Sequence, residues 1–212
     1  MILHNKIDAQ LPSWRNRVTK LLKEHGDKVA GEVTISQVYG GMRSVKALVT
    51  DISFVDPNVG IRFRGHTLPV VLEKLPKPEG AEMPYVGGLY YLLMVGDFPT
   101  EEEALKVERA WAENSDVPEH VFDVLRSMPK DTHPMALFSQ AILSLQGGSK
   151  FAKRYAEGMS KMDIWRPALD DAMFMTSKLG VIAAFIYQMK YKDGVEPKYD
   201  PNLDYGANFA QM

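Results

Sequence analysis

Two stretches of this sequence contain no charged residue: PMALFSQAILSLQ at positions 134–146 and LGVIAAFIYQM at positions 179–189. Each is long enough for about three turns of α-helix. A surface helix needs a polar face, and these two have almost none. Each is therefore expected to be enclosed, either by its own domain or by a second subunit, and the residues alone leave that choice open.

The composition supports a globular protein with a sizeable core. A chain of 212 residues with 45% hydrophobic residues suits one large domain or two small ones. With 25 basic and 27 acidic residues the net charge is -2, which gives no reason to expect a nucleic-acid or anionic-membrane partner. The absence of cysteine excludes disulfides, thiolate catalysis and cysteine-ligated metals.

No targeting or membrane segment is visible in the sequence. The first residues, MILHNKIDAQLPSW, fit neither a secretory nor a transit peptide. The longest apolar runs are shorter than the roughly 18 to 20 residues that a bilayer requires. These features predict a soluble, cytoplasmic protein.

Apolar periodicity and terminal signals predict that most of the chain is helical. Thr100 followed by Glu103 forms a capping box, and Asp131 or Thr132 can cap the helix that Pro134 begins. Gly26 stands where a left-handed helix cap is expected. The expected helices are 11–25, 68–75, 85–96, 100–114, 118–129, 134–146, 149–160, 167–191 and a short one near the end of the chain.

A small β-hairpin is the only sheet that the sequence predicts. Its strands are Ile52-Ser53-Phe54 and Ile61-Arg62-Phe63, and Asp56-Pro57-Asn58-Val59-Gly60 forms the turn between them. Alternation along a strand would place Arg62 and Arg64 on one face, where they either cover the sheet or contact an anion.

Few residues suggest catalysis. The histidines at positions 4, 25, 66, 120 and 133 match no metal-binding spacing, and no Walker, dinucleotide or nucleophile-elbow motif is present. His133 fits a packing or capping role, and Asp170-Asp171 fits the first turn of a helix better than a catalytic pair. Tyr39-Gly40-Gly41-Met42-Arg43 is either an ordinary turn or a phosphate site, because two glycines expose backbone N–H groups beside an arginine.

Several longer motifs, in the right order, resemble citrate synthase, particularly the type found in mitochondria and some bacteria. The resemblance begins at about Val29, covers nearly all of the chain after it, and matches the amino-terminal half of that family. The motifs are Gly40-Gly41-Met42-Arg43, Leu48-Val49, Asp56-Pro57, Gly60-Ile61-Arg62-Phe63-Arg64-Gly65, Pro99-Thr100-Glu101-Glu102, His133-Pro134-Met135, Phe151-Ala152-Lys153, Tyr155-Ala156-Glu157-Gly158, Lys190-Tyr191-Lys192-Asp193-Gly194, Leu203-Asp204-Tyr205 and Asn208-Phe209.

The resemblance implies an all-α (mainly helical) fold and a homodimer whose subunits each have a large and a small domain. It implies condensation of acetyl-CoA with oxaloacetate and water to citrate and coenzyme A, without a tightly bound cofactor. The family's catalytic residues all lie beyond the position that matches Met212. Residues 1–212 are therefore expected to form a single incomplete large domain, with no catalytic residue, no metal site and no activity of its own.

Two residues are expected, by resemblance, to bind coenzyme A. Arg43 matches an arginine that contacts a coenzyme A phosphate, and Lys161 takes the place of a basic residue that reaches the coenzyme of the partner subunit. The resemblance also places helices 134–146 and 167–191 in the dimer contact. Ile142→Asp or Ala184→Asp is then expected to dissociate the dimer, because each would bury an unpaired charge.

Two alternatives remain open on the sequence. One is a non-catalytic helical homodimerisation module that keeps the family's interface. The other is part of a 2-methylcitrate synthase, because the residues that discriminate between the substrates lie largely outside this chain.

Overall fold

The computed structural model describes residues 1–45, 49–56 and 58–212. It confirms a mainly helical chain with one small antiparallel sheet. In chain order the elements are α1 (Ile2–His25), α2 (Ile35–Tyr39), β1 (Ser53–Asp56), β2 (Gly60–Phe63), β3 (His66–Thr67), α3 (Leu68–Lys74), α4 (Val86–Val95), α5 (Glu101–Ala112), α6 (Glu119–Ser127), α7 (Pro134–Ser144), the 3-10 helix η1 (Leu145–Gly148), α8 (Lys150–Ala156), α9 (Trp165–Tyr191) and α10 (Tyr205–Gln211).

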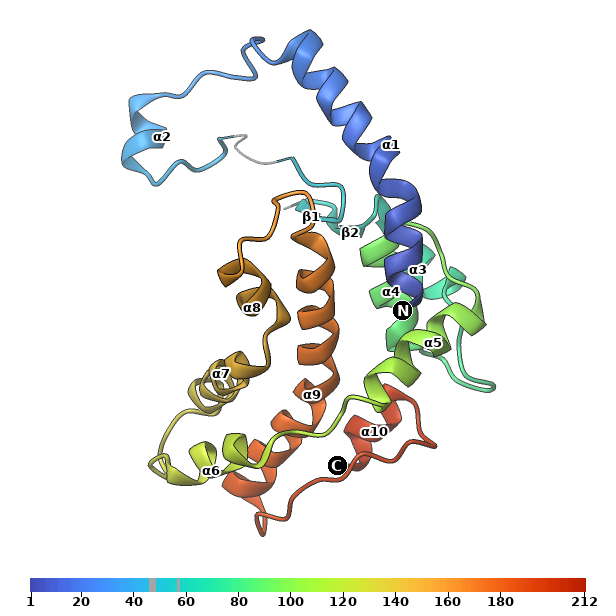
Figure 1. The fold of residues 1–212 in the computed structure, drawn as a ribbon, viewed down its shortest axis with the longest axis vertical. Helices are drawn as coiled ribbons and strands as arrows, with labels where there is room; N and C mark the ends of the chain where they lie inside the picture. The colour runs from blue at the N-terminus through green and yellow to red at the C-terminus, as the bar shows by residue number, and fades with distance from the viewer. Residues whose placement is uncertain (46–48, 57) are drawn as a thin grey trace.

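The long helix α9 is the centre of the arrangement (Figure 1). It packs against α5, α7, α8 and α10, while α4 packs against α5 and α1. By length and mean hydropathy α9 is the one helix among the described residues that meets the criteria for a membrane span. Its contacts with four other helices are those of a core helix.

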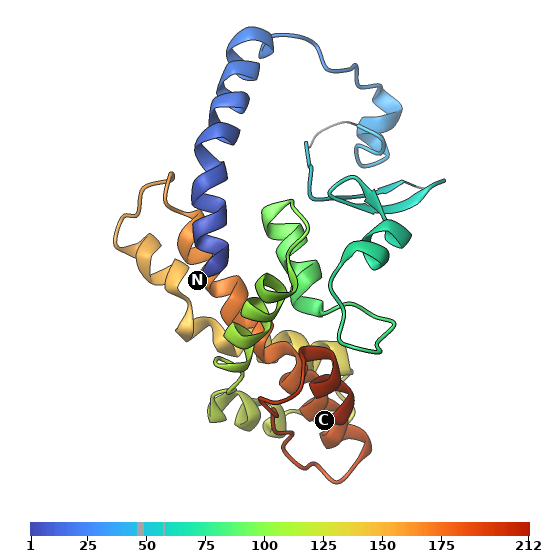
Figure 2. The ribbon, with the colours of Figure 1, turned by 90° about the vertical axis from the view of Figure 1, so that its right-hand side faces the viewer.

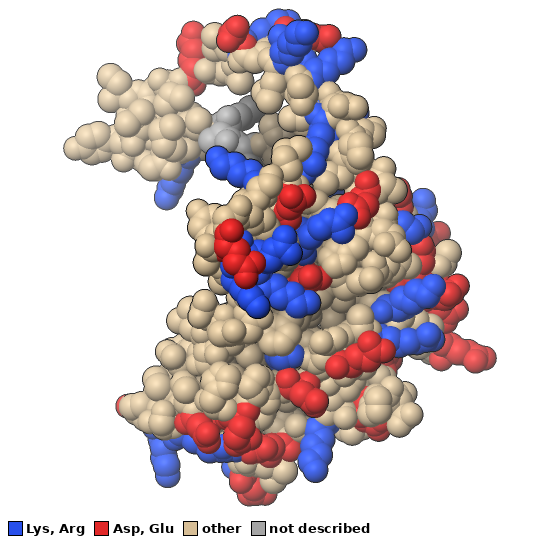
Figure 3. Space-filling model, in the orientation of Figure 1, with Lys and Arg blue, Asp and Glu red and all other residues tan. Residues whose placement is uncertain are grey.

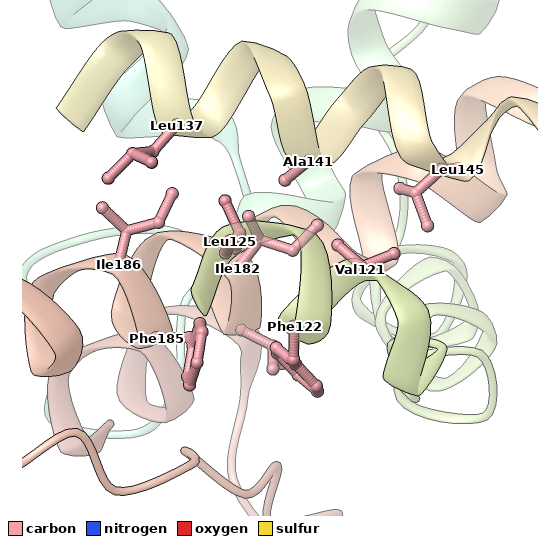
Figure 4. Close-up of a cluster of buried hydrophobic side chains, with 10 residues drawn as sticks. Val121, Phe122, Leu125, Leu137, Ala141, Leu145, Ile182, Phe185 and Ile186 are labelled. Atoms are coloured by element: carbon pink, nitrogen blue, oxygen red, sulfur yellow. The ribbon is translucent and has the colours of Figure 1, made fainter. Parts of the chain in front are cut away.

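The first core cluster joins α6, α7 and α9 (Figure 4). Leu137 and Ala141 of α7 point towards Ile182 and Ile186 of α9, as expected for an uncharged helix. However, the opposite face of α7 is open, because Met135 and Leu143 are 61% and 68% exposed. The chain itself therefore encloses much of α9 but only one face of α7, and enclosure of the other face by a second subunit stays a prediction.

The second core cluster joins α1, α4, α5 and α9, and it explains why α1 begins earlier than expected. The sequence predicted a start at Leu11, where apolar residues at helical spacing begin. Instead α1 begins at Ile2 and contains Pro12 in its interior. Leu3 is fully buried against residues that include Tyr91 and Trp111. Burial of these apolar side chains offsets the roughly 3 kcal/mol that an interior proline costs.

The sheet has three strands in the order β1-β2-β3, so the predicted hairpin gains a short third strand. Ser53 pairs with Phe63 and Asp56 with Gly60. The turn is confirmed on its described residues, because the Asp56 carboxylate accepts the amides of Asn58 and Val59; Pro57 lies outside the described residues, as do positions 46–48.

Helix ends agree with the sequence in part. Thr100 and Glu103 form the expected capping box. His133, rather than Asp131 or Thr132, caps α7 by accepting the Met135 amide on Nδ1 at 3.2 Å. Gly26 has φ -60°, so it is not left-handed as expected. Helix α8 ends at Ala156, earlier than the predicted Ser160.

Residues 26–45 and 49–52, which we call the arm, carry α2 away from the helical body (Figures 1 and 2). Nearly all of these residues are exposed. The exposed apolar residues of the arm are Val29, Val33, Ile35, Val38, Tyr39, Met42, Val49 and Ile52.

Candidate functional site

The turn that follows α2 contains the predicted coenzyme A residue Arg43. Three of its residues have left-handed backbone: Gly41 at φ 77°, Met42 at φ 61° and Ser44 at φ 62°. Among the described residues, the amides of Gly41, Arg43 and Ser44 find no protein acceptor. Backbone of this kind, with free N–H groups, can form a concave anion site.

The Arg43 side chain is exposed at this turn. None of the ion pairs within residues 1–45, 49–56 and 58–212 involves it. A guanidinium presents several N–H donors in a planar fork that matches two oxygens of a phosphate. Within the described residues, the turn therefore combines an unpaired cation with backbone donors that have no acceptor.

Lys161 lies in the segment between α8 and α9, and its side chain is also exposed. The backbone of this segment is fixed, because Arg15 Nη2 donates to the Met162 carbonyl at 2.6 Å and the Met162 amide donates to Ser160 Oγ at 3.2 Å. Figure 2 shows this segment and the end of α2 on opposite sides of α1. The two segments therefore lie apart in the fold.

A groove of about 420 Å³ lies between α8, the start of α9 and the start of α1. Its basic side chains are interspersed with acidic ones over this face (Figure 3). Asp170 contacts His4 Nε2 at 3.1 Å and Lys150 Nζ at 3.6 Å. The residues that line the groove are His4, Lys150, Lys153, Arg154, Glu157, Arg166, Pro167 and Asp170.

Asp170 and Asp171 contact different parts of the fold. Asp171 accepts hydrogen bonds from the amides of Lys150 and Phe151, at 2.8 and 3.0 Å, and from Ser149 Oγ. The Asp171 carboxylate thus accepts the N–H groups at the start of α8, whose first turn contains no acidic residue of its own. The sequence placed both aspartates in the first turn of their own helix. Instead α9 begins at Trp165, so its first turn has no acidic residue, and Asp171 serves the start of α8.

Arg62 and Arg64 do not share a strand face. Arg64 follows β2 with φ 48°, which turns its side chain away from the strand alternation. Its Nε donates to the Leu93 carbonyl at 3.0 Å, at the end of α4, and its Nη1 pairs with Asp51 at 3.3 Å. Arg62 donates to the Gly65 carbonyl at 3.2 Å. Both guanidinium groups are used by the fold itself.

No cluster of three or more metal-ligating side chains occurs in the described part of the chain. His133 caps a helix, as one reading of the sequence predicted, and His120 Nε2 contacts the Ser144 carbonyl at 2.9 Å.

Sequence reasoning missed one residue that contacts the Arg43 turn. Gln37 Nε2 donates to the Arg43 carbonyl at 3.3 Å. The signal was present, because Thr34 and Gln37 have the spacing of a capping box, which also marks the start of α2.

Comparison with known proteins identifies citrate synthases. The family model described as "Citrate synthase, C-terminal domain" matches residues 41–212. A mitochondrial citrate synthase of Saccharomyces cerevisiae is 46% identical over 95% of this chain and 42% of its own length. The peroxisomal citrate synthase of the same organism is 42% identical over 99% of this chain and 46% of its own length. The chain thus spans less than half the length of these relatives.

Two solved structures of citrate synthases share the fold. The enzyme from Pyrobaculum aerophilum superposes with a TM-score of 0.67 over 87% of this chain and 45% of its own, at 20% identity. The enzyme from Thermotoga maritima has a TM-score of 0.57 over 81% of this chain and 40% of its own, also at 20% identity.

The expectation of a cytoplasmic protein is wrong. Relatives from Saccharomyces cerevisiae and Aspergillus niger, at 46% and 43% identity, are named mitochondrial citrate synthases. The expectation rested on the missing leader pattern in the first residues, and such a pattern does not decide the compartment. Because the family model covers residues 41–212, which is well over half of the sequence, this chain belongs to the citrate synthase family.

Proposed function

We propose that this chain forms part of a citrate synthase, and that the complete protein condenses acetyl-CoA with oxaloacetate and water to give citrate and coenzyme A. Relatives at 42–46% identity that carry the name citrate synthase support this activity. Acetyl-CoA is a substrate here, and no tightly bound cofactor is needed.

Within that activity the chain contributes to coenzyme A binding through Arg43. The observation that carries this proposal is the turn at Gly40–Ser44, where an exposed guanidinium stands beside backbone amides without an acceptor in the described residues. A phosphate of coenzyme A offers oxygens for both kinds of donor.

Lys161 serves the coenzyme A bound to a second subunit. The segment that carries Lys161 and the end of α2 lie apart in Figure 2, and this supports the division between two subunits. Lysine provides a point charge where arginine would provide a planar fork, so its contribution is electrostatic.

The protein acts as a homodimer through the open face of α7. This face carries Met135, Ala136, Ser139 and Leu143, all exposed and none charged. Small and apolar side chains of this kind allow two helices to approach closely and bury their surfaces.

The chemical step belongs to residues outside this chain, which is one incomplete large domain. A turnover assay of the 212-residue chain with acetyl-CoA and oxaloacetate is expected to show no citrate. Measurable citrate formation would overturn this assignment of the chemistry.

The protein is mitochondrial, in keeping with the names of relatives from Saccharomyces cerevisiae and Aspergillus niger. Fractionation of source cells, followed by immunoblotting, tests this location. Recovery with peroxisomes would instead match the other Saccharomyces relative.

Calorimetric titration of the 212-residue chain with coenzyme A tests the binding role. Arg43→Ala is expected to weaken binding about tenfold, because a charge-assisted contact to phosphate is lost. Arg62→Ala is the matched control, since that guanidinium donates to the Gly65 carbonyl. Unchanged affinity of Arg43→Ala, or no binding by the unmodified chain, would refute the proposed role.

A further inference from the structure

Gln37 occupies the centre of the segment that carries Arg43. Its Oε1 accepts the Thr34 amide at 3.0 Å, while its own amide donates to Thr34 Oγ1 at 3.2 Å. These two bonds form the capping box that starts α2. Gln37 is half-buried, whereas the flanking Ser36 and Val38 are exposed.

The same residue holds the turn on the other side of α2. The Gln37 carbonyl accepts the Met42 amide at 2.7 Å, and Gln37 Nε2 donates to the Arg43 carbonyl at 3.3 Å. Gln37 therefore holds both ends of the Met42-Arg43 dipeptide, namely the N–H of Met42 and the C=O of Arg43. The Cα of Arg43 lies between these two anchors.

The backbone at this point needs such anchors. Met42 and Ser44 are both left-handed, a conformation that residues with a Cβ rarely adopt, and Gly41 between α2 and Met42 is left-handed too. A conformation of this kind persists only where surrounding contacts impose it. The arm is largely exposed, so packing supplies little of that restraint.

We propose that Gln37 is a positioning residue for coenzyme A binding, which holds the strained turn in the form that presents the Arg43 guanidinium to a phosphate. This inference rests on the proposed function of Arg43. Gln37 does not touch the ligand in this proposal; it acts through the backbone of Arg43.

Two variants separate this role from helix capping. Gln37→Met keeps the length of the side chain but removes both the capping acceptor and the donor to Arg43. Thr34→Ala removes the other half of the capping box and leaves the Gln37 side chain in place. In titrations with coenzyme A, Gln37→Met is expected to weaken binding about fivefold, the value of one neutral hydrogen bond, and Thr34→Ala less than twofold.

A double-mutant cycle with Arg43→Ala shows whether Gln37 acts through Arg43. In the Arg43→Ala background, Gln37→Met is expected to have a smaller effect on the affinity than in the unmodified chain, because only the backbone amides of the turn remain to bind the phosphate. Urea unfolding of each variant identifies any loss of binding that comes from global destabilisation, which would persist in the Arg43→Ala background.

The outcomes distinguish the inference from the function on which it rests. If Arg43→Ala weakens binding and Gln37→Met does not, the positioning role is refuted and coenzyme A binding by Arg43 stands. If Gln37→Met and Thr34→Ala weaken binding equally, Gln37 is only a helix cap and the inference is refuted. If the unmodified chain does not bind coenzyme A, both proposals fail.

Discussion

Glu103 ties three helices together through one carboxylate. It accepts hydrogen bonds from the Thr100 amide at 3.0 Å and from the Tyr91 hydroxyl at 3.1 Å, and it pairs with Lys6 Nζ at 2.7 Å. Burial alone would raise the pKa of this carboxyl. The hydrogen bonds from Lys6, Thr100 and Tyr91 outweigh burial and lower its pKa to about 2.

This lowered pKa predicts a pH-dependent contribution to stability. A carboxyl whose pKa is lower in the folded state stabilises the fold above its unfolded pKa, and the contribution is lost as the pH falls from about 4.5 towards 2. Glu103→Gln is therefore expected to reduce the free energy of unfolding by about 1–2 kcal/mol at pH 7, after allowance for solvent screening, and by less at pH 3.

Urea unfolding at both pH values measures this difference. Glu102→Gln is the control, because Glu102 is exposed and pairs with Lys106 on the surface of the same helix. A Glu103→Gln deficit of the same size at pH 3 and pH 7 would contradict the linkage to ionisation.

Arg64 shows the limit of reading single residues from a pattern. The period of two along a strand placed it beside Arg62, and only the left-handed φ of 48° after β2 redirects it to the end of α4. Non-glycine residues seldom adopt this conformation, so no local rule predicts it. The prediction for Gly26 is wrong for the opposite reason. This glycine was expected to be left-handed, but its backbone is right-handed.

At the scale of elements, α4 and α5 approach closely where two glycines lie in sequence. A Cβ at Gly87 would stand 2.7 Å from the Ala104 carbonyl oxygen and 2.7 Å from Glu108 Cγ. A Cβ at Gly88 would meet neighbours at 3.6 Å, an ordinary contact distance. The neighbouring positions therefore differ only in the space available.

We expect Gly87→Ala to destabilise the chain by about 1–3 kcal/mol, because backbone of α5 must move. Gly88→Ala is expected to stabilise it by about 0.5–1 kcal/mol, because alanine restricts the unfolded chain more than glycine does and fits the space. Thermal or urea unfolding of the two variants measures both effects. Equal effects would show that this helix contact does not depend on the missing Cβ at Gly87.

The middle helices were predictable because their signals are local. Thr100 caps α5, proline follows α3 and begins α7, and apolar runs mark α4 and α9. The start of α1 was not predictable in this way, because Pro12 is a local argument against the helix and the buried contacts of Leu3 are long-range. The short β3 was missed for the same reason, since two residues carry no periodicity.

The candidate site was predictable by resemblance rather than by physics. The residues alone left the Arg43 turn as either an ordinary turn or a phosphate site. The left-handed backbone at Met42 and Ser44, and the contact of Gln37 with Arg43, depend on how the turn folds.

For the whole molecule, the open face of α7 makes a testable interface. Leu143→Asp is expected to leave the fold intact, because Leu143 is 68% exposed, and to dissociate the proposed dimer by placing an unpaired charge in it. Sedimentation at micromolar concentration measures the change. Asn16→Asp, which adds the same charge at an exposed position of α1, is the control, and it should leave the sedimenting mass at that of the dimer.

The structure also revises the earlier choice of variants. Ala184 is only 5% exposed within a single chain, so Ala184→Asp would damage the core before it tested an interface. Ile142 is half-buried, which leaves Leu143 as the cleaner position. A Leu143→Asp protein that remained dimeric would show that the dimer interface does not include this face of α7.

The exposed arm has a consequence for a chain that is cut within it. Residues 26–33 offer accessible, irregular backbone to a protease, while residues 1–25 remain attached to the body by contacts that do not pass through the arm. Leu3 is buried in the core, Lys6 pairs with Glu103 and Asp8 pairs with Arg166. A nicked molecule would therefore keep its amino-terminal helix as a non-covalent complement, and the two pieces would separate only under denaturing conditions.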